Sequence, residues 1–345
     1  MTKLNFVIGC YTSPTSDIGL SFFEFCSDTI DIQIISTLQV ANPSYCLTSG
    51  DLLLAVNESG TDDDKITVLN ISNLSAPKIL GQYSSNGSSP CYISADKDLN
   101  HAFVANYGSG SLSVRPFISF GILGTKSQVV NELPKANCES NFHAVILSPD
   151  DKFLLVTNLG TDTISVFQYN KNAIHESVQT SSVNQFIFKE RVGPRHLIFS
   201  NDGEFVYVIG EINANIYVFK WNNGILKLKQ EVPLMNKDYM GANSAADLHL
   251  MPSGDFLLAS NRGDANQIAV FSVNKVTGEL TYSSSFDTGG VGPRNFAVDP
   301  TGNFVFAANQ YSNQISIFRF INLPTVQLKL LKNLTLPSPV FIKFF

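Results

Sequence analysis

Arginine is scarce in this 345-residue chain, and three of its six copies stand where they could do chemistry. Arg195 and Arg294 each follow a Gly-Pro pair, and Arg262 closes a short apolar run. A histidine, His143, and a glutamate, Glu211, occupy related places. Guanidinium groups bind carboxylate and phosphate oxygens, and imidazole and carboxylate groups transfer protons. Together these side chains could bind an anion and move a proton on it.

A repeat of about 50 residues accounts for these positions. Segments such as GPRHLIFSNDGEFVYVIGE from Gly193 hold two apolar runs around a polar turn, which is typical of a β-hairpin. Two further runs follow each hairpin. One position recurs at the start of the first run, at Ser44, Cys91, His143, Arg195, Ala246, Arg294 and Val340. A second recurs at the end of the second run, at Glu58, Tyr107, Leu159, Glu211, Arg262 and Gln310.

Units of this length with four short strands are typical of a β-propeller. Six units run from about residue 42, and PSPVFIKFF at the C-terminus supplies one more strand. NFVIGCY, LSFFEF and IQIISTLQV near the N-terminus supply three others. The sequence therefore predicts an all-β fold: a single domain over residues 1–345, forming a seven-bladed β-propeller with four antiparallel strands per blade. One C-terminal strand plus three N-terminal strands would close the last blade.

The two recurrent positions should meet at one end of the propeller. In an antiparallel hairpin, the start of the first strand and the end of the second lie at the same end. A purely structural interpretation pairs Arg195 with Glu211. It leaves Arg262, Arg294 and His143 without partners, and converging guanidiniums repel one another unless an anion compensates them. We therefore predict an anion-binding site at the mouth of the central channel.

An asparagine precedes the second recurrent position in five units, at Asn57, Asn106, Asn158, Asn261 and Asn309. A residue that recurs in this way is most simply structural, because asparagine at a strand end bonds to nearby backbone. Asn261, next to Arg262, is also kept as a candidate substrate-binding residue. Tyr107, which occupies the second recurrent position itself, is another.

Composition excludes several classes of protein. The formal net charge of −6 argues against a nucleic-acid-binding protein. No apolar run approaches the roughly 18 residues of a membrane span, and the apolar stretch from Phe6 to Cys10 is too short for a signal peptide. Five cysteines without a C-x-x-C pair indicate free thiols, so we expect a cytoplasmic protein.

Neither a metal nor a cofactor is predicted. The cluster has one carboxylate and one imidazole among three arginines, whose charge opposes a cation. Phosphate-loop and dinucleotide-binding motifs are absent from the sequence. His196 directly follows Arg195, and strand alternation would point it to the opposite side of its strand.

The repeated units resemble the lactonase family of seven-bladed propellers, which includes bacterial 6-phosphogluconolactonases and the fungal carboxy-cis,cis-muconate lactonizing enzyme. The resemblance rests on NFHAV, GPRH, VIGE and SNRG, although the fifth unit begins AAD in place of Gly-Pro-Arg. It implies a catalytic set at the matching positions, which are His143, Arg195, Glu211 and Arg262. It also implies a small anionic lactone as the substrate.

The leading hypothesis is hydrolysis of 6-phospho-D-glucono-1,5-lactone to 6-phosphogluconate. Glu211 or His143 would be the general base, Arg195 and Arg262 would stabilise the oxyanion, and Arg294 would bind the phosphate. The same side chains suit a carboxymuconate lactonizing cycloisomerase. A non-catalytic propeller that binds a small anion or a protein partner is the third alternative.

Overall fold

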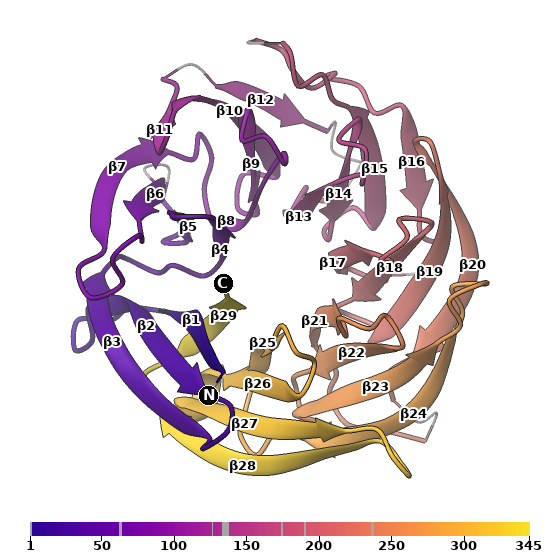
Figure 1. Cartoon of the computed structure of the whole chain (residues 1–345). Coiled ribbons are helices and arrows are strands. Elements are labelled where there is room, and N and C mark those ends of the chain that lie inside the picture. Colours follow the sequence, from indigo (N-terminus) through magenta and orange to yellow (C-terminus); the bar gives the residue numbers. More distant parts are fainter. Residues whose placement is uncertain are drawn as a thin grey trace.

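Seven β-sheets stand like blades around a central axis in the computed structural model (Figure 1). The structure describes residues 2–61, 64–125, 127–132, 138–173, 175–189, 191–235 and 238–345. In these residues the regular structure is β-strand, apart from one short 3₁₀ turn at Gln310–Ser312. The all-β prediction and the propeller prediction are both confirmed.

The strands follow the chain from blade to blade. Blade 1 holds β4 (Cys46–Ser49), β5 (Leu52–Asn57), β6 (Lys65–Asn70) and β7 (Lys78–Ser84). Blade 2 holds β8 (Pro90–Ala95), β9 (His101–Asn106), β10 (Ser111–Ser119), β11 (Ile122–Leu123) and β12 (Gln128–Asn131). Blade 3 holds β13 (Phe142–Leu147), β14 (Phe153–Asn158), β15 (Thr163–Gln168) and β16 (Asn184–Ile187). In blade 2 the long strand β10 pairs with β12 over its first half and with β11 at its far end.

The other blades are regular four-stranded antiparallel sheets. Blade 4 holds β17 (Pro194–Phe199), β18 (Phe205–Gly210), β19 (Asn215–Asn222) and β20 (Ile225–Pro233). Blade 5 holds β21 (Ala245–Leu250), β22 (Phe256–Asn261), β23 (Gln267–Val273) and β24 (Leu280–Asp287). Blade 6 holds β25 (Pro293–Val298), β26 (Phe304–Asn309), β27 (Gln314–Ile321) and β28 (Gln327–Thr335).

Blade 7 joins the two ends of the chain, as predicted. Its strand order is β29 (Pro339–Phe344), β1 (Lys3–Cys10), β2 (Ile18–Cys26) and β3 (Asp31–Gln39). The C-terminal strand β29 lies innermost, near the axis (Figure 1). Phe6 of β1 stands opposite Phe344 of β29, and the backbone N–H of Ile342 donates to Asn295 Oδ1 of blade 6 at 2.7 Å. This pairing leaves no gap between the first and last blades.

Apolar side chains pack between neighbouring blades. Blades 6 and 7, for example, share a cluster in which Phe306 lies edge-on to Phe6 and Phe25, at 5.3 and 5.2 Å between ring centroids. Burying a large apolar side chain contributes about 1.5–3 kcal/mol. Because each blade packs on two neighbours in this way, the inner strands are held at fixed positions around the axis.

Most of the inner strands begin with a register irregularity. In β17 it lies between Pro194 and Leu197, and β8, β13, β21 and β25 have an equivalent one. An extra residue of this kind breaks the strict alternation of side chains. The expectation that His196 points away from Arg195 is therefore wrong, because His196 Nε2 lies 3.2 Å from Arg195 Nη1.

The recurrent asparagines are structural, as predicted. All five are buried where the second strand of their blade ends. Asn261 Oδ1 accepts from the backbone N–H of Ser244 at 3.1 Å, and Asn309 Nδ2 donates to the carbonyl of Thr288 at 3.1 Å. These bonds fix the chain that enters each blade, directly beside the start of its inner strand.

Candidate active site

Both recurrent positions face one cavity of about 230 Å³ at the predicted end of the propeller. The first position contributes three of its residues and the second contributes four. The lining is Glu58, Cys91, Tyr107, His143, Glu211, Arg262 and Arg294. Blades 1 to 6 each supply at least one of these side chains. The structure therefore brings together residues that lie more than 200 positions apart in the sequence.

Glu211 forms ion pairs with two guanidiniums. Its Oε2 lies 2.9 Å from Arg195 Nε and 3.2 Å from Arg262 Nη2, although neither nitrogen is aligned for a hydrogen bond within the described residues. Arg262 is fixed in turn by a hydrogen bond from Nε to the carbonyl of Ser244 at 3.0 Å. Burial, together with the charge of Arg195, lowers the pKa of Arg262 to about 10, so this guanidinium stays charged at neutral pH. Glu211 thus faces the cavity as a carboxylate with a fixed orientation.

Arg195 lies behind Glu211 and does not line the cavity. Its side chain is 2% exposed, and Nη1 donates to the carbonyl of Ala246 and faces His196 Nε2. Its nearest anionic group is Glu211. The expected role of Arg195 as an oxyanion donor does not fit this placement, and its contacts suit it to holding the Glu211 carboxylate in position.

A second ion pair, between two residues far apart in the sequence, faces the same cavity. Arg294 Nη2 lies 3.3 Å from Glu58 Oε2, and the Tyr11 hydroxyl donates to the same oxygen at 2.8 Å. The Tyr11 ring also lies beneath the guanidinium, 5.3 Å from its central carbon. Burial would lower the pKa of Arg294, but the Tyr11 and Glu58 groups raise it above its ordinary value.

Sequence reasoning missed Tyr11 and did not select Glu58. Tyr11 follows β1 directly and is therefore the blade 7 member of the second recurrent series. The sequence does carry the signal, because NFVIGCY is a predicted strand that ends at Tyr11, whereas the second recurrent series given above begins at Glu58. A further consequence is that Arg262 and Arg294 do have partners, so the expectation that they lack them is wrong.

Among these side chains, three guanidiniums face two carboxylates. His143 adds no charge at neutral pH, because burial and then the charge of Arg195 hold its pKa well below 6.5. The buried carboxylate of Asp247, whose charge acts on Arg195, balances the third guanidinium. The charges of the cluster therefore cancel overall, and any preference for an anionic ligand rests on the Arg262 and Arg294 guanidiniums that line the cavity.

The imidazole of the cavity belongs to His143. It is buried on β13, and its Nδ1 has no hydrogen-bond partner among the residues that the structure describes. The rings of Tyr107 and His196 pack edge-on against it, at 5.8 and 5.2 Å between centroids. Because His143 lines the cavity, its neutral imidazole can accept a proton there.

The remaining predicted residues divide into two groups. Tyr107 lines the cavity. Asn261 does not, because it is fully buried and its Nδ2 donates to Asn243 Oδ1 at 2.8 Å.

The described part of the chain contains no group of three His, Cys, Asp or Glu side chains placed to hold a metal ion. It also contains no helix long and apolar enough to cross a membrane.

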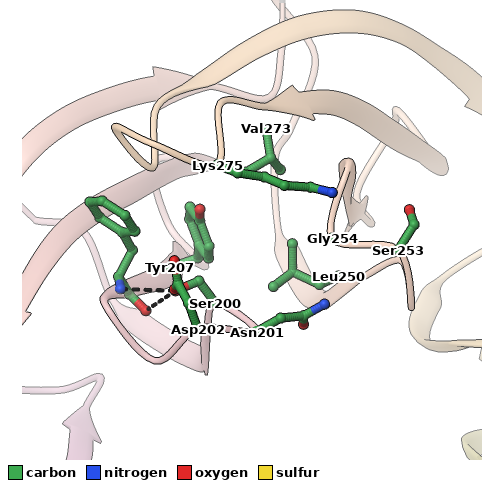
Figure 2. A pocket seen from close by; sticks show the side chains of 10 residues that line it. Ser200, Asn201, Asp202, Tyr207, Leu250, Ser253, Gly254, Val273 and Lys275 are labelled. Carbon is green, nitrogen blue, oxygen red and sulfur yellow. Dashed lines mark hydrogen bonds between the residues drawn. The ribbon is translucent and has the colours of Figure 1, made fainter.

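A second cavity, of about 200 Å³, lies at the opposite ends of β17 and β21 (Figure 2). Tyr207, Leu250 and Lys275 are among the side chains around it. The Lys275 ammonium already pairs with Asp255 at 2.7 Å, and no histidine or arginine lines this cavity. In this respect it differs from the first cavity, whose wall includes both residue types.

Comparison with known proteins gives the family. The sequence model described as lactonase, 7-bladed beta-propeller matches residues 5–344, almost the whole chain. The chain belongs to this lactonase family. A 6-phosphogluconolactonase of Formosa agariphila is 31% identical over 90% of this chain and 91% of its own. A 6-phosphogluconolactonase of Bacillus subtilis is 27% identical over 100% and 99%.

A solved structure of the lactonase fold agrees closely with this one. The periplasmic gluconolactonase of Pseudomonas aeruginosa superimposes with a TM-score of 0.92 at 29% identity, covering 99% of both chains. The family resemblance found in the NFHAV, GPRH, VIGE and SNRG segments is thus confirmed across the full propeller.

Proposed function

We propose that this lactonase-family protein hydrolyses 6-phospho-D-glucono-1,5-lactone to 6-phosphogluconate in the cavity between Glu211 and Arg294. The observation that carries the proposal is the pairing of a free, neutral imidazole with a fixed carboxylate and two arginines in one cavity. Ester hydrolysis needs a base for water and a donor for the developing oxyanion. Family membership supports the same reaction class.

The residues divide the work as follows. His143 takes a proton from water while the water oxygen attacks the lactone carbonyl carbon. Glu211 accepts a hydrogen bond from that water and orients it, because its other oxygen is occupied by the guanidiniums. Arg262 faces the oxyanion. The bond between the carbonyl carbon and the ring oxygen then breaks, and the ring oxygen takes the proton back from His143. The geometry favours His143 as the base, because Glu211 already has two partners.

The phosphate would lie at Arg294. This guanidinium lines the cavity, and it comes from blade 6, across from His143 of blade 3. The 6-phosphogluconolactonase relatives support a phosphorylated substrate, whereas the gluconolactonase of Pseudomonas aeruginosa is named for an unphosphorylated one. The Arg294 guanidinium favours the phosphorylated lactone, because a guanidinium in the cavity can bind phosphate oxygens.

The test is acid release from purified protein, with spontaneous hydrolysis subtracted, on 6-phosphogluconolactone, gluconolactone and a muconolactone in parallel. We expect turnover of the phosphorylated lactone, and a fall in kcat of at least about a hundredfold in H143N and E211Q. H175Q changes an exposed histidine outside this cavity and is the matched control. Turnover of muconolactone alone would favour the cycloisomerase, and binding of 6-phosphogluconate without turnover would favour a binding protein.

The pH profile of kcat/KM checks the assignment of His143. Burial and the neighbouring guanidiniums hold the pKa of His143 well below 6.5, so the imidazole remains neutral as the pH falls through 6.5. We expect kcat/KM to stay level through this range and to decline only at lower pH, as the base becomes protonated. A loss of activity centred at pH 6.5 or above would contradict His143 as the base.

A cytoplasmic location is also part of the proposal. All five cysteines are free, including three that are buried, which is compatible with a reducing compartment. The periplasmic relative shows that the family also acts elsewhere. Cell fractionation with an antibody to the native protein tests the location.

A further inference from the structure

A buried carboxylate, Asp247, lies directly beneath the candidate active site. Its two oxygens accept from His196 Nδ1 at 2.7 Å, His249 Nε2 at 2.9 Å, Asn295 Nδ2 at 2.5 Å and the backbone N–H of Leu248 at 2.9 Å. Although burial opposes the charged form, His249 and His196 hold the pKa of Asp247 below its ordinary value. Asp247 is therefore a fixed anion inside the propeller, on the strand that follows Arg195 and His196 around the axis.

His196 lies between Asp247 and Arg195, and its partners fix its tautomer. An arginine nitrogen can only donate, so the 3.2 Å contact with Arg195 Nη1 requires a lone pair on His196 Nε2. The proton of the neutral ring must then be on Nδ1, where Asp247 accepts it. Burial and the charge of Arg195 lower the pKa of His196 to about 4, which keeps the ring neutral.

The contacts form a continuous chain from the propeller interior to the cavity. Asp247 fixes His196, His196 accepts from Arg195, and Arg195 Nε lies 2.9 Å from Glu211 Oε2. The three inner members are each less than 10% exposed. The tautomer of His196 matters here, because a proton on Nε2 would face the Arg195 donor and repel it.

We propose that Asp247 and His196 form a positioning dyad, which holds the Arg195 guanidinium against Glu211 and so sets the orientation of that carboxylate toward the cavity. This proposal depends on the proposed function in one respect, which is that Glu211 takes part in hydrolysis. Neither dyad residue lines the cavity, so neither contacts substrate. They act through Arg195.

Two substitutions of His196 separate positioning from packing. Glutamine places its amide near the Nε2 position of the imidazole and can accept from Arg195, whereas asparagine places its amide near Nδ1 and cannot reach Arg195. Both remove a buried aromatic ring, so both should lower stability to a similar extent. H249Q removes an Asp247 partner on the side away from Arg195 and controls for loss of a bond to the carboxylate.

We expect H196N to lower kcat by about tenfold to a hundredfold, because small misplacements of catalytic groups have effects of this size. H196Q should recover part of that loss, because it restores the acceptor for Arg195 but not the contact with Asp247. The Kd for 6-phosphogluconate should change less than about twofold in both, because Arg294 lies outside the chain of contacts. Equal losses of kcat in H196N and H196Q would overturn the proposal, as would no loss in either variant.

A second readout does not depend on turnover. Labelling arginine with ¹⁵N gives only six Nε–H signals, one for each arginine of the chain. We expect the Arg195 Nε–H signal to exchange slowly with solvent in the native protein and in H196Q, and to exchange faster in H196N. If the native protein hydrolyses no lactone, the proposed function fails while this measurement still decides the dyad. Unchanged exchange in H196N would refute it.

Discussion

Arg294 can pair with the Glu58 carboxylate or with a bound anion. The competition between these two partners sets how strongly the cavity attracts an anion. In the structure Glu58 pairs with the Arg294 guanidinium at 3.3 Å, and both side chains are less than one fifth exposed. A phosphate entering the cavity must share Arg294 with this carboxylate. The Tyr11 hydroxyl, which donates to Glu58, holds the competing carboxylate in place. Glu58 thus weakens the site for anions and keeps the empty cavity from accumulating charge.

Removing the negative charge of Glu58 should therefore tighten product binding. We expect E58Q to lower the Kd for 6-phosphogluconate by up to about fivefold, the range of a partly exposed ion pair. The measurement is titration calorimetry at two salt concentrations, since the gain should shrink as salt screens the charges. E204Q makes the same change of charge at an exposed pair with Lys220 and should leave the Kd unchanged. Weaker binding in E58Q would mean that Glu58 itself contacts the ligand.

The C-terminal strand β29 makes blade 7 depend on two distant parts of the chain. Phe344 packs on Phe6 and Phe306 at 5.3 and 5.1 Å between centroids, whereas its neighbour Phe345 is 37% exposed. We expect F344A to lower the free energy of unfolding by about 3–5 kcal/mol, and F345A by less than about 1 kcal/mol. Urea unfolding of both variants measures the difference. Similar effects of the two substitutions would show that β29 does not close the ring through its inner face.

The strands were predictable because every repeat unit shows the same order of apolar runs and polar turns. Apolar alternation and polar turns recur at each unit, so the strands, the seven blades and the joined seventh blade follow from local pattern and counting. The irregularity at the start of β17 was not predictable, because it depends on the pairing of Pro194 with Gly210 across the hairpin. For the same reason strand alternation places His196 on the opposite side of its strand and gives no sign of its contact with Asp247.

The sequence predicts which residues form the candidate site better than it predicts which carboxylate pairs with which guanidinium. The recurrent positions identified His143, Glu211, Arg262 and Arg294 as neighbours, and the cavity contains all four. Which carboxylate pairs with which guanidinium depends on how blades meet across the axis. Arg294 and Glu58, separated by 236 residues, have no local signal that links them.

For the molecule as a whole, the buried histidines make stability depend on pH. In the folded protein, burial lowers the pKa of three histidines, His101, His143 and His196, in His196 to about 4. In the unfolded chain these rings take up a proton near pH 6.5. Below that pH the unfolded state binds more protons, so the free energy of unfolding must fall as the pH falls from about 6.5 to about 4.

We expect this loss to reach about 3 kcal/mol from His196 alone, at about 1.4 kcal/mol per unit of pKa. Urea unfolding across this pH range measures it, with a slope corresponding to about two to three protons between native and unfolded states, one for each buried histidine that is held neutral. H196Q should reduce that slope by one proton, while H175Q, which changes an exposed ring, should leave it unchanged. A slope that H196Q does not alter would mean that His196 is charged in the folded protein. In that case its Nε2 could not accept from Arg195, and the contact chain to Glu211 would be broken at the same residue.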